Sequence, residues 1–270
     1  MRPERRLPRG GGRRMEETEE LIQLCVRSLV SQMIAAPGVE LQVTQRCVLA
    51  LTDEPLADFN RLIRGADPDA RGFLVRSAAR AKERGSPLSA VMSPQAARTL
   101  APIATGLGFT AVGTSPLMVL RRDVEVRPSR PVRVVRALDP EMVVTAGDMI
   151  AAAFDEARDI IARCIDVCMT PTAGVETYVA LDEDGPICTV SVTPTGDTAG
   201  ISLMATPPDR QGKGAGRALL SQVIDDYRRR GVGRFHLGAT QAGRPLYESL
   251  GFELVADLPV WIMEGPAGSA

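Results

Sequence analysis

Ile201-Ser-Leu-Met-Ala-Thr-Pro-Pro-Asp-Arg-Gln-Gly-Lys-Gly-Ala-Gly-Arg-Ala-Leu-Leu220 contains a short apolar strand, a proline-stiffened turn, a glycine-rich loop and the start of a helix. The strand is expected to end by Thr206, because Pro207 and Pro208 have no amide hydrogen to donate to a sheet. A helix is predicted next from apolar residues at helical spacing, namely Leu219, Leu220, Val223, Ile224 and Tyr227. Its N-terminus would offer amide groups and the positive end of the helix dipole, so the stretch predicts an anion site.

The loop of this predicted anion site matches neither of two common phosphate-binding motifs. Its three glycines allow backbone conformations that other residues avoid, and Lys213 and Arg217 add positive charge. A P-loop has Ser or Thr directly after its lysine, whereas Gly214 follows Lys213 here. A Rossmann fingerprint has the spacing G-x-G-x-x-G, whereas the spacing here is G-x-G-x-G. The pattern that remains is Gln211-x-x-Gly214-x-Gly216.

The composition is that of a globular protein without a strong charge bias. The 270 residues suffice for one large or two ordinary domains, and 44% hydrophobic with 24% charged residues is usual for such proteins. A formal net charge of −1 argues against nucleic acid as the main partner. No stretch is long and apolar enough to cross a membrane, so we expect no membrane partner either.

The cysteines indicate neither a metal site nor a disulfide framework. The five of them are scattered, without the spacing of metal ligands, and the chain has one histidine. An odd, scattered set suits a reducing cytosol, so a cytoplasmic location is expected. Cys164 and Cys168, four residues apart in a predicted helix, are interpreted as buried small side chains rather than a redox pair.

The first half of the chain predicts alternating helices and strands. Residues 1–14 contain six arginines with proline and glycine, and are interpreted as a disordered leader. No apolar core of a signal peptide follows them, and Met15 is an alternative start of the chain. Beyond the leader, the patterns predict helices over residues 19–35, 56–63, 72–83 and 96–107, and extended segments over residues 39–51, 88–92 and 117–120.

The second half begins after a charged, proline-rich linker at residues 126–131, which separates a domain at 15–125 from one at 132–264, with a tail at 265–270. Asp139 as cap and Pro140 in the first turn predict a helix, which continues to about Cys168 with a break near Gly147. An antiparallel meander and a final set of elements follow, with strands at 176–181, 187–193, 199–205, 234–239 and 254–263 and a short helix at 244–250.

The two halves share an internal repeat with an offset of 143 residues. At this offset Pro102 meets Pro245, Leu107-Gly108-Phe109 meets Leu250-Gly251-Phe252, and the apolar segments at 117–120 and 260–263 coincide. Several matches in one register indicate duplicated domains. The first copy lacks the glycine triplet and has Ala104 where the second has Tyr247, so it is expected to shape a pocket rather than perform chemistry.

The second half resembles the GNAT (GCN5-related N-acetyltransferase) superfamily over residues 132–264. The resemblance rests on the order of elements and on three motifs, Leu203-Met-Ala-Thr-Pro-Pro208, Gln211-x-x-Gly214-x-Gly216 and Leu246-Tyr-Glu-Ser-Leu-Gly-Phe252. The first half resembles the degenerate N-terminal copy of tandem GNAT proteins. The resemblance implies an α/β (α+β) fold in which a mixed, largely antiparallel sheet is flanked by helices and the whole is duplicated.

The resemblance also implies acetyl-CoA as cofactor and assigns roles to residues of this chain. The backbone of Leu203, Met204, Ala205 and Thr206 would hold the pantetheine arm and the acyl carbonyl. The pyrophosphate would be cradled by Gln211, Gly212, Lys213, Gly214, Ala215, Gly216 and Arg217. Tyr247 would protonate the departing thiolate as general acid, the alternative being a core aromatic. Many family members have Asn where Thr240 stands, so Thr240 would contact the cofactor less well or not at all.

No general base is evident, since the strand at 201–205 lacks the glutamate that family members often carry there. Glu176 and a relay of water molecules are alternatives. His236 alternates with apolar residues and is interpreted as a satisfied structural histidine. Asp155, Glu156 and Asp159 lie where substrate often docks in this family, and are interpreted as a solvated helix face.

The function expected from the resemblance is transfer of acetyl from acetyl-CoA to a primary amine of a small molecule by direct attack. A non-catalytic acyl-CoA-binding or regulatory module is the alternative, and a relative with a different donor is a third. The identity of the amine, the length of the acyl chain and the oligomeric state, monomer or homodimer, are left open by the sequence.

Overall fold

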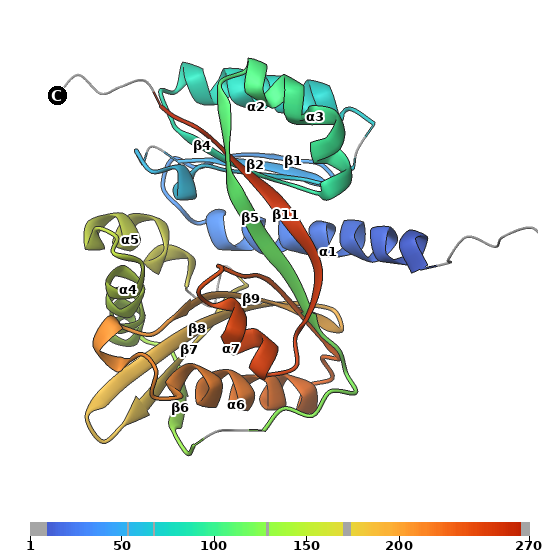
Figure 1. Ribbon diagram of the computed structural model, residues 1–270. Coiled ribbons are helices and arrows are strands. Elements are labelled where there is room, and N and C mark those ends of the chain that lie inside the picture. The colour runs from blue at the N-terminus through green and yellow to red at the C-terminus, as the bar shows by residue number, and fades with distance from the viewer. Residues whose placement is uncertain (1–9, 53, 67, 128–129, 170–173, 266–270) are drawn as a thin grey trace, which may run out of the picture.

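One mixed, largely antiparallel sheet runs through both halves of the chain. The computed structural model describes residues 10–52, 54–66, 68–127, 130–169 and 174–265. Within them the sheet has 11 strands in the order β1-β2-β3-β4-β11-β5-β10-β9-β8-β7-β6. Helices flank it on both sides, which confirms the predicted fold class (Figure 1).

The first half runs from α1 to β5. Its elements are α1 (Gly10–Met33), β1 (Glu40–Val43), β2 (Cys47–Leu51), the 3-10 turn η1 (Ala57–Phe59), β3 (Arg61–Arg64), α2 (Ala70–Glu83), β4 (Leu88–Met92), α3 (Pro94–Gly106) and β5 (Phe109–Leu120). Ser93 caps α3, since its side chain accepts a hydrogen bond from the Ala96 amide. Apolar side chains of α2 and α3 pack on one face of β2 to β4.

The second half runs from β6 to β11. Its elements are β6 (Arg133–Arg136), α4 (Pro140–Phe154), α5 (Arg158–Cys164), the 3-10 turn η2 (Asp166–Cys168), β7 (Glu176–Asp182), β8 (Gly185–Thr195), β9 (Thr198–Ala205), the 3-10 turn η4 (Pro208–Arg210), α6 (Ala215–Arg229), β10 (Arg234–Gly238), α7 (Arg244–Ser249) and β11 (Glu253–Met263). The Asp139 side chain accepts a hydrogen bond from the Met142 amide, so the predicted cap of α4 is confirmed.

Three local predictions need correction. Helix α1 begins at Gly10, so residues 10–14 belong to a helix rather than to a leader, and residues 1–9 lie outside the described part. The helix expected over 56–63 is a turn followed by strand β3, because this short apolar run is paired on both sides by β2 and β4.

The break expected at Gly147 lies instead at Asp155, which adopts a left-handed conformation with φ of 56°. Gly147 stays inside α4 for a packing reason. A Cβ atom there would collide with Asp166 Oδ1 and would lie 2.8 Å from Arg158 Nη2. The missing side chain therefore makes room for the ion pair between Arg158 of α5 and Asp166 of η2 (2.6 Å). Arg158 also forms an ion pair with Asp148 of α4, which ties α4 to these two elements.

The structure repeats the same order of elements in each half. The series β1-β2-β3-α2-β4-α3-β5 corresponds to β7-β8-β9-α6-β10-α7-β11. In both series the third and fourth strands are parallel, β3 with β4 and β9 with β10, whereas their neighbours are antiparallel. The duplication predicted from the 143-residue offset is therefore visible in the topology.

The two copies exchange their last strands. Strands β5 and β11 pair with each other along their whole length. The end of β5, residues 117–120, then pairs with β10 of the second half. The end of β11, residues 260–263, pairs with β4 of the first half. Each half is thus completed by a strand of the other, and the predicted linker at 126–131 joins two halves that share one sheet, with residues 128–129 outside the described part.

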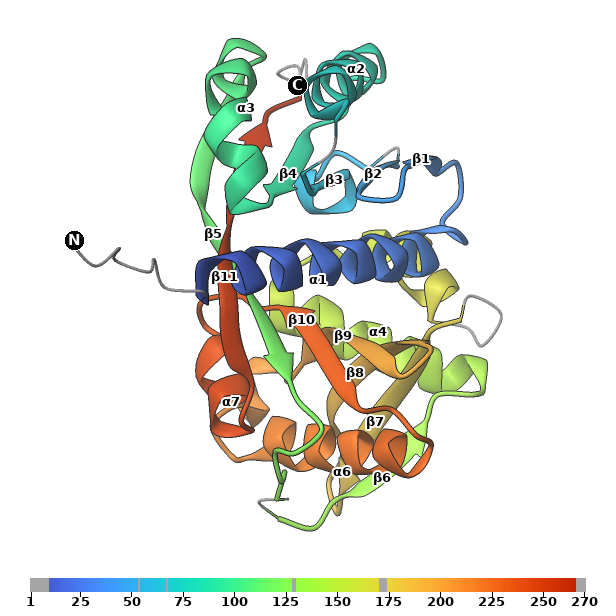
Figure 2. The ribbon, with the colours of Figure 1, turned by 90° about the vertical axis from the view of Figure 1, so that its right-hand side faces the viewer.

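Helix α1 lies between the two halves. In Figures 1 and 2 it runs below the layer of β1 to β4 and above the layer of β8 to β10, while β5 and β11 connect the layers. Its residues Leu21 and Ile22 are fully buried against Leu117 and Val119 of β5 and Leu258 of β11. The second half is closed on its other face by α6. No helix in the described ranges has the length and apolar character needed to span a bilayer.

The strand exchange predicts that neither half folds alone. A fragment of residues 132–270 would leave β10 without β5 and β11 without β4, exposing unpaired strand edges. We expect it to be insoluble or to unfold without a cooperative transition, whereas the full chain unfolds in one transition, measured by circular dichroism in urea. Co-expression with residues 1–131 should restore the cooperative transition. Cooperative unfolding of the isolated fragment would contradict the prediction.

Candidate functional site

Strand β9 departs from regular geometry just before the glycine loop. Thr189 and Ser191 of β8 face Ala205 and Ser202 of β9, so β9 carries one extra residue at this point. Within this β-bulge Leu203 has a φ of 49°, which is unusual for a residue with a branched side chain. The bulge turns the Leu203–Met204 backbone out of the ladder, where the sequence predicted backbone contacts to a pantetheine arm.

The neighbouring strands β9 and β10 separate at the same level. They pair in parallel over Thr198–Gly200 and Arg234–His236. Beyond this point β9 continues to Ala205 and β10 to Gly238, with no further pairs between them in the described residues. A V-shaped opening therefore begins after Gly200 and His236, and the bulge forms one of its sides.

The glycine loop leads into α6 with the conformations that its sequence predicts. Gly212 and Gly214 have φ of 73° and 77°, in the left-handed region that favours glycine. Gly214 is the N-cap of α6, so no side chain caps the first turn of the helix. At Gly216 a Cβ atom would lie 2.9 Å from Met204 Cε and 3.2 Å from Leu246 Cδ2. Glycine there lets the start of α6 approach β9 and α7 closely.

The polar side chains of the loop brace its backbone. Gln211 donates a hydrogen bond from Nε2 to the Thr206 carbonyl (3.0 Å). Lys213 donates from Nζ to the Asp209 carbonyl (2.9 Å), and Arg217 donates from Nη1 to the carbonyl that ends α7, at Ser249 (2.6 Å). The loop is therefore held in shape by its own residues, and its two cations lie at the positive end of α6.

Tyr247 lies on α7, near Cys188 of β8 and outside the set of residues that line the cavity described below. Its ring is 8% exposed and packs edge-on against Phe252, with 5.7 Å between ring centroids. Burial, and to a smaller extent the nearby Cys188 thiol, raises the pKa of Tyr247 far above its ordinary value, so the hydroxyl keeps its proton. The Cys188 sulfur accepts a hydrogen bond from Thr206 Oγ1 (3.1 Å). Tyr247 is thus close to the end of the predicted pantetheine path.

Thr240 has a local structural role. Its Oγ1 accepts a hydrogen bond from the Gly243 amide (3.0 Å), which forms the turn that leads into α7. A Cβ atom at Gly243 would lie 3.1 Å from this oxygen and 3.4 Å from Tyr247 Cε2. Thr240 therefore helps to position Tyr247. The sequence does not indicate this role, because it shows Thr240 only as a residue that stands where many family members have Asn.

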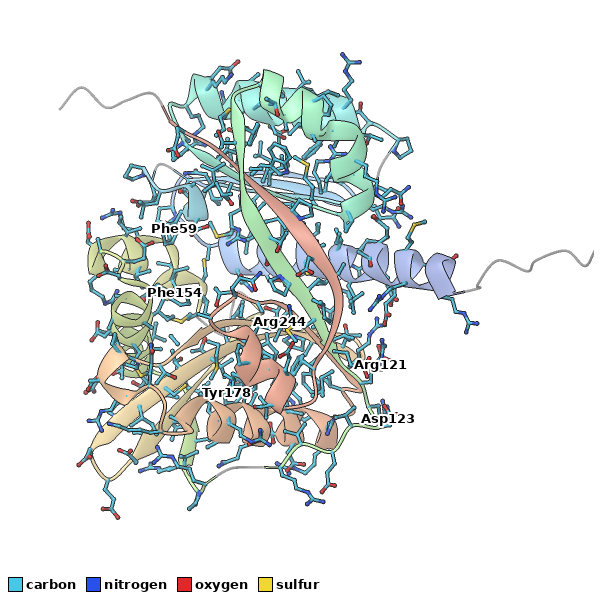
Figure 3. All side chains as sticks on the ribbon, in the orientation of Figure 1. Phe59, Arg121, Asp123, Phe154, Tyr178 and Arg244 are labelled. Carbon is cyan, nitrogen blue, oxygen red and sulfur yellow. The ribbon has the colours of Figure 1, made fainter. Side chains whose placement is uncertain are left out.

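A cavity of about 550 Å³ opens beside the bulge and is shared by the two halves. Its wall comes from α1, η1, β3, β4, α4 and α5, from the middle of β5 and β11, and from β9 and β10 where they separate. Figure 3 shows two of its lining residues on the same side of the molecule. Phe59 of η1 lies below the layer of β1 to β4, and Phe154 of α4 lies beneath Phe59. Leu203 and Thr240 line the cavity too, so it reaches the site predicted from the sequence.

Charged residues occur in this largely apolar cavity. Asp58, Arg61 and Glu156 line it, together with His236. Burial raises the pKa of Glu156 above its ordinary value, and the charges of Asp58 and Asp155 raise it further. Glu156 follows the end of α4, and its carboxylate has no hydrogen bond or ion pair in the described part of the chain. It is a lining residue of the cavity rather than part of a solvated helix face.

Two further candidates are placed differently by the structure. Asp159 is exposed and forms an ion pair with Arg163 (2.8 Å), as expected for a solvated helix face. Glu176 lies outside the cavity lining and is bound by Arg230 (2.8 Å) and by the Tyr178 and Tyr227 hydroxyls (2.8 Å each). The Arg230 contact is the main cause that lowers its pKa to about 2. A carboxylate held this strongly in its charged form is a poor general base.

His236 is buried at the apex of the V-shaped opening, but it is not satisfied by the protein. It is 2% exposed, and neither ring nitrogen makes a well-formed hydrogen bond within the described residues. Burial lowers its pKa to about 4, a change that the Leu24 backbone opposes only weakly. The expectation of a satisfied structural histidine is therefore wrong for this ring, which is neutral and lines the cavity.

The burial predicted for Cys164 and Cys168 is confirmed. All five cysteines are free thiols, and Cys164 and Cys168 are buried. Across the part of the chain that the structure describes, no group of three or more His, Cys, Asp or Glu side chains is placed to hold a metal ion.

Comparison with known proteins finds the same family for the second half. Residues 173–254 match the family model described as "Acetyltransferase (GNAT) domain". A curated relative, the [ribosomal protein bS18]-alanine N-acetyltransferase of Escherichia coli K12, is 38% identical over 76 residues, which are 27% of this chain and 51% of the relative. The same enzyme of Shigella flexneri matches equally well. The chain thus spans about half the length of the curated relatives it matches.

Two solved structures resemble the whole chain. A GCN5-related N-acetyltransferase from Kribbella flavida has a TM-score of 0.65 at 17% identity, over 92% of this chain and 96% of its own. A structure titled as a tandem GNAT protein from the clavulanic acid biosynthesis pathway has a TM-score of 0.60 at 16% identity, over 97% and 98% of the two chains. At these identities the likeness shows the fold, which extends over both halves.

Proposed function

Residues 173–254 match a GNAT acetyltransferase domain, and from that premise we propose that the chain transfers acetyl from acetyl-CoA to the primary amine of a small molecule. The observation that carries the proposal is the bulged end of β9, followed by an uncapped α6 N-terminus, beside a cavity of about 550 Å³. Enclosure of this cavity by both halves favours a small molecule over a protein surface as acceptor.

The residues present suit acetyl-CoA. Left-handed Gly212 and Gly214 and the start of α6 would hold the pyrophosphate, and Gly216 leaves space where a Cβ atom would reach Met204. The bulge at Leu203 presents backbone groups along the opening, as a pantetheine arm requires. When bound, the cofactor supplies an acetyl group activated as a thioester.

Tyr247 is proposed as general acid. Its raised pKa keeps the hydroxyl protonated at neutral pH, so it can donate that proton to the leaving sulfur as the C–S bond breaks. Thr240 and Phe252 hold the ring in place, the first through the turn before α7 and the second by edge-on packing. A phenol with an ordinary, exposed environment would also be protonated, so the contribution of burial is mainly orientation.

Glu156 is proposed as the proton acceptor for the attacking amine. Leu203 at the bulge packs against the α4–α5 cluster, and Glu156 joins those two helices. A carboxylate whose pKa is raised toward neutrality and which lacks a protein partner is suited to receive a proton. The nitrogen forms the new N–C bond and gives up a proton to Glu156, while the sulfur receives one from Tyr247.

The cofactor site predicts a specific sensitivity to Gly214→Ala. Alanine at a φ of 77° is strained, so the loop must change shape and CoA binding should weaken at least 10-fold, measured by calorimetry. Gly196→Ala is the matched control, because Gly196 has a similar left-handed conformation, with φ of 61°, but lies in the β8–β9 turn. Equal CoA affinity of the two variants would contradict the proposed site.

Tyr247→Phe should lower kcat about 100-fold while leaving CoA affinity within about threefold, because only the proton donor is lost. Tyr178→Phe serves as control, since its hydroxyl bonds Glu176 away from the cavity and its loss should affect stability rather than kcat. The steady-state rate of CoA release measures kcat for both variants. Binding of CoA without turnover of any amine by the unmodified chain would favour the non-catalytic alternative, which the lack of an acid on β9 motivates.

Glu156→Gln should remove the acidic limb from the profile of kcat against pH. Because the pKa of Glu156 is raised, its carboxylate becomes protonated at a higher pH than an ordinary glutamate, and kcat should fall as pH decreases through that range. The variant should lose about 100-fold in kcat and show no such limb. Asp159→Asn, three residues further on, should keep the profile of the unmodified chain. An unchanged profile in Glu156→Gln would exclude the role.

A further inference from the structure

The cavity contains one cationic side chain without a counter-charge. Arg61 lines it from β3, and in the described part of the chain its guanidinium makes no hydrogen bond or ion pair. Its Nε atom is shielded from solvent and also lacks an acceptor. A guanidinium nitrogen removed from water without an acceptor is unfavourable, so the site is incomplete as it stands.

Arg61 is unusual among the arginines of this chain. The other described arginines that lack a hydrogen-bonded or ion-paired partner are all exposed to solvent, namely Arg13, Arg27, Arg71, Arg98 and Arg133. The fully buried Arg64, three residues away on the opposite face of the fold, donates to the Ala70 carbonyl. Among the described arginines that are not exposed, Arg61 is thus the one whose side chain has no hydrogen-bonded or ion-paired partner.

The surroundings of Arg61 connect it to the proposed reaction site. It lies opposite Ser89 of β4 in the register, and its charge reaches Cys25 of α1, lowering the pKa of a thiol that burial raises. One turn along the same face of α1, Ser28 is buried without a partner. Ser28 and His236 both approach Gly200, since a Cβ atom there would lie 2.5 Å from Ser28 Oγ and 3.2 Å from His236 Nε2. Within the described ranges, polar groups without hydrogen-bond partners therefore extend from Arg61 through Ser28 to His236, where β9 and β10 separate.

Acidic groups lie elsewhere on the wall. Asp58 precedes Arg61 by three residues, yet no ion pair joins them in the described residues, and Glu156 lines the cavity from the second half, between α4 and α5. The charge of Asp58 is felt at Glu156, which places the two carboxylates near each other. The cavity thus has an anionic region and, separately, a single cation.

Resting on the proposed acetyl transfer, we infer that the acceptor is a zwitterion, a primary amine that also carries a carboxylate, and that Arg61 binds this carboxylate. The planar fork of a guanidinium fits a carboxylate with two parallel hydrogen bonds. Among the described lining residues Arg61 is the one formal cation, which matches one negative charge rather than the two of a phosphate. The acids Asp58 and Glu156 receive the amine at the other end.

The test uses the full chain and sets of three matched amines. Each set contains a free amino acid, its carboxamide and the amine that remains after decarboxylation, for example leucine, leucinamide and isoamylamine. For at least one set we expect kcat/KM for the amino acid to exceed that for both partners by about 10- to 100-fold, the range of a bidentate charged contact. The rate of CoA release measures it.

Variants then assign the preference to one side chain. Arg61→Gln should lower kcat/KM for the amino acid by about the same 10- to 100-fold and leave the carboxamide and the amine within threefold, and Arg61→Lys should recover part of the loss. Arg98→Gln, on the exposed face of α3, should behave as the unmodified chain. Thermal unfolding establishes that each variant is folded. If Arg61→Gln does not fold, the three-amine comparison with the unmodified chain decides alone.

The outcomes separate the two proposals. Turnover of carboxamides or simple amines at rates equal to those of the amino acids overturns the carboxylate inference and leaves acetyl transfer standing. If Arg61→Gln lowers kcat/KM equally for the amino acid, the carboxamide and the simple amine, the carboxylate inference is likewise overturned and acetyl transfer still stands. Failure of every amine to consume acetyl-CoA, with CoA bound or unbound, overturns acetyl transfer and the inference with it.

Discussion

The exchange of strands between the two halves is the constraint on which the rest of the molecule depends. The edge of β10 is satisfied only by β5, and that of β4 only by β11, so backbone hydrogen bonding joins the copies more firmly than surface contact could. The long β5–β11 pair also sets how the two layers face each other and leaves room for α1 between them (Figure 2). The cavity follows from this arrangement, because its walls belong to both layers.

A half that has lost its own glycine loop therefore still contributes to the site. In the first copy the chain passes from β3 to α2 without the glycine triplet, and β3 and β4 stay paired over four residues. In the second copy β9 and β10 separate after Gly200 and His236. The first copy instead supplies Phe59, Asp58 and Arg61 to the wall opposite the opening. The two copies thus contribute different parts, the second the glycine loop and the first much of the cavity wall.

The sequence allowed the glycine loop, the cap at Asp139, the meander and the repeat to be predicted, because each is encoded by neighbouring residues or by a fixed offset. The strand exchange was not predictable, since β-pairing between distant segments leaves no local pattern. The helix predicted over 56–63 is wrong because a short apolar run is compatible with either a helix or a strand until its neighbours are known. The importance of Glu156 and Arg61 depends on burial and on missing partners, which only the folded arrangement reveals.

The pairing of β4 with β11 also sets the order in which the protein can be completed. Leu88 to Met92 are made early, but the strand segment that pairs with them, residues 260–263, comes after every other described helix and strand. Until then the first layer has an open edge next to an apolar face, the kind of surface that promotes misassembly during synthesis. Contacts so distant in sequence form slowly. Because β11 lies between β4 and β5, the first layer can be closed only after β11 has been made.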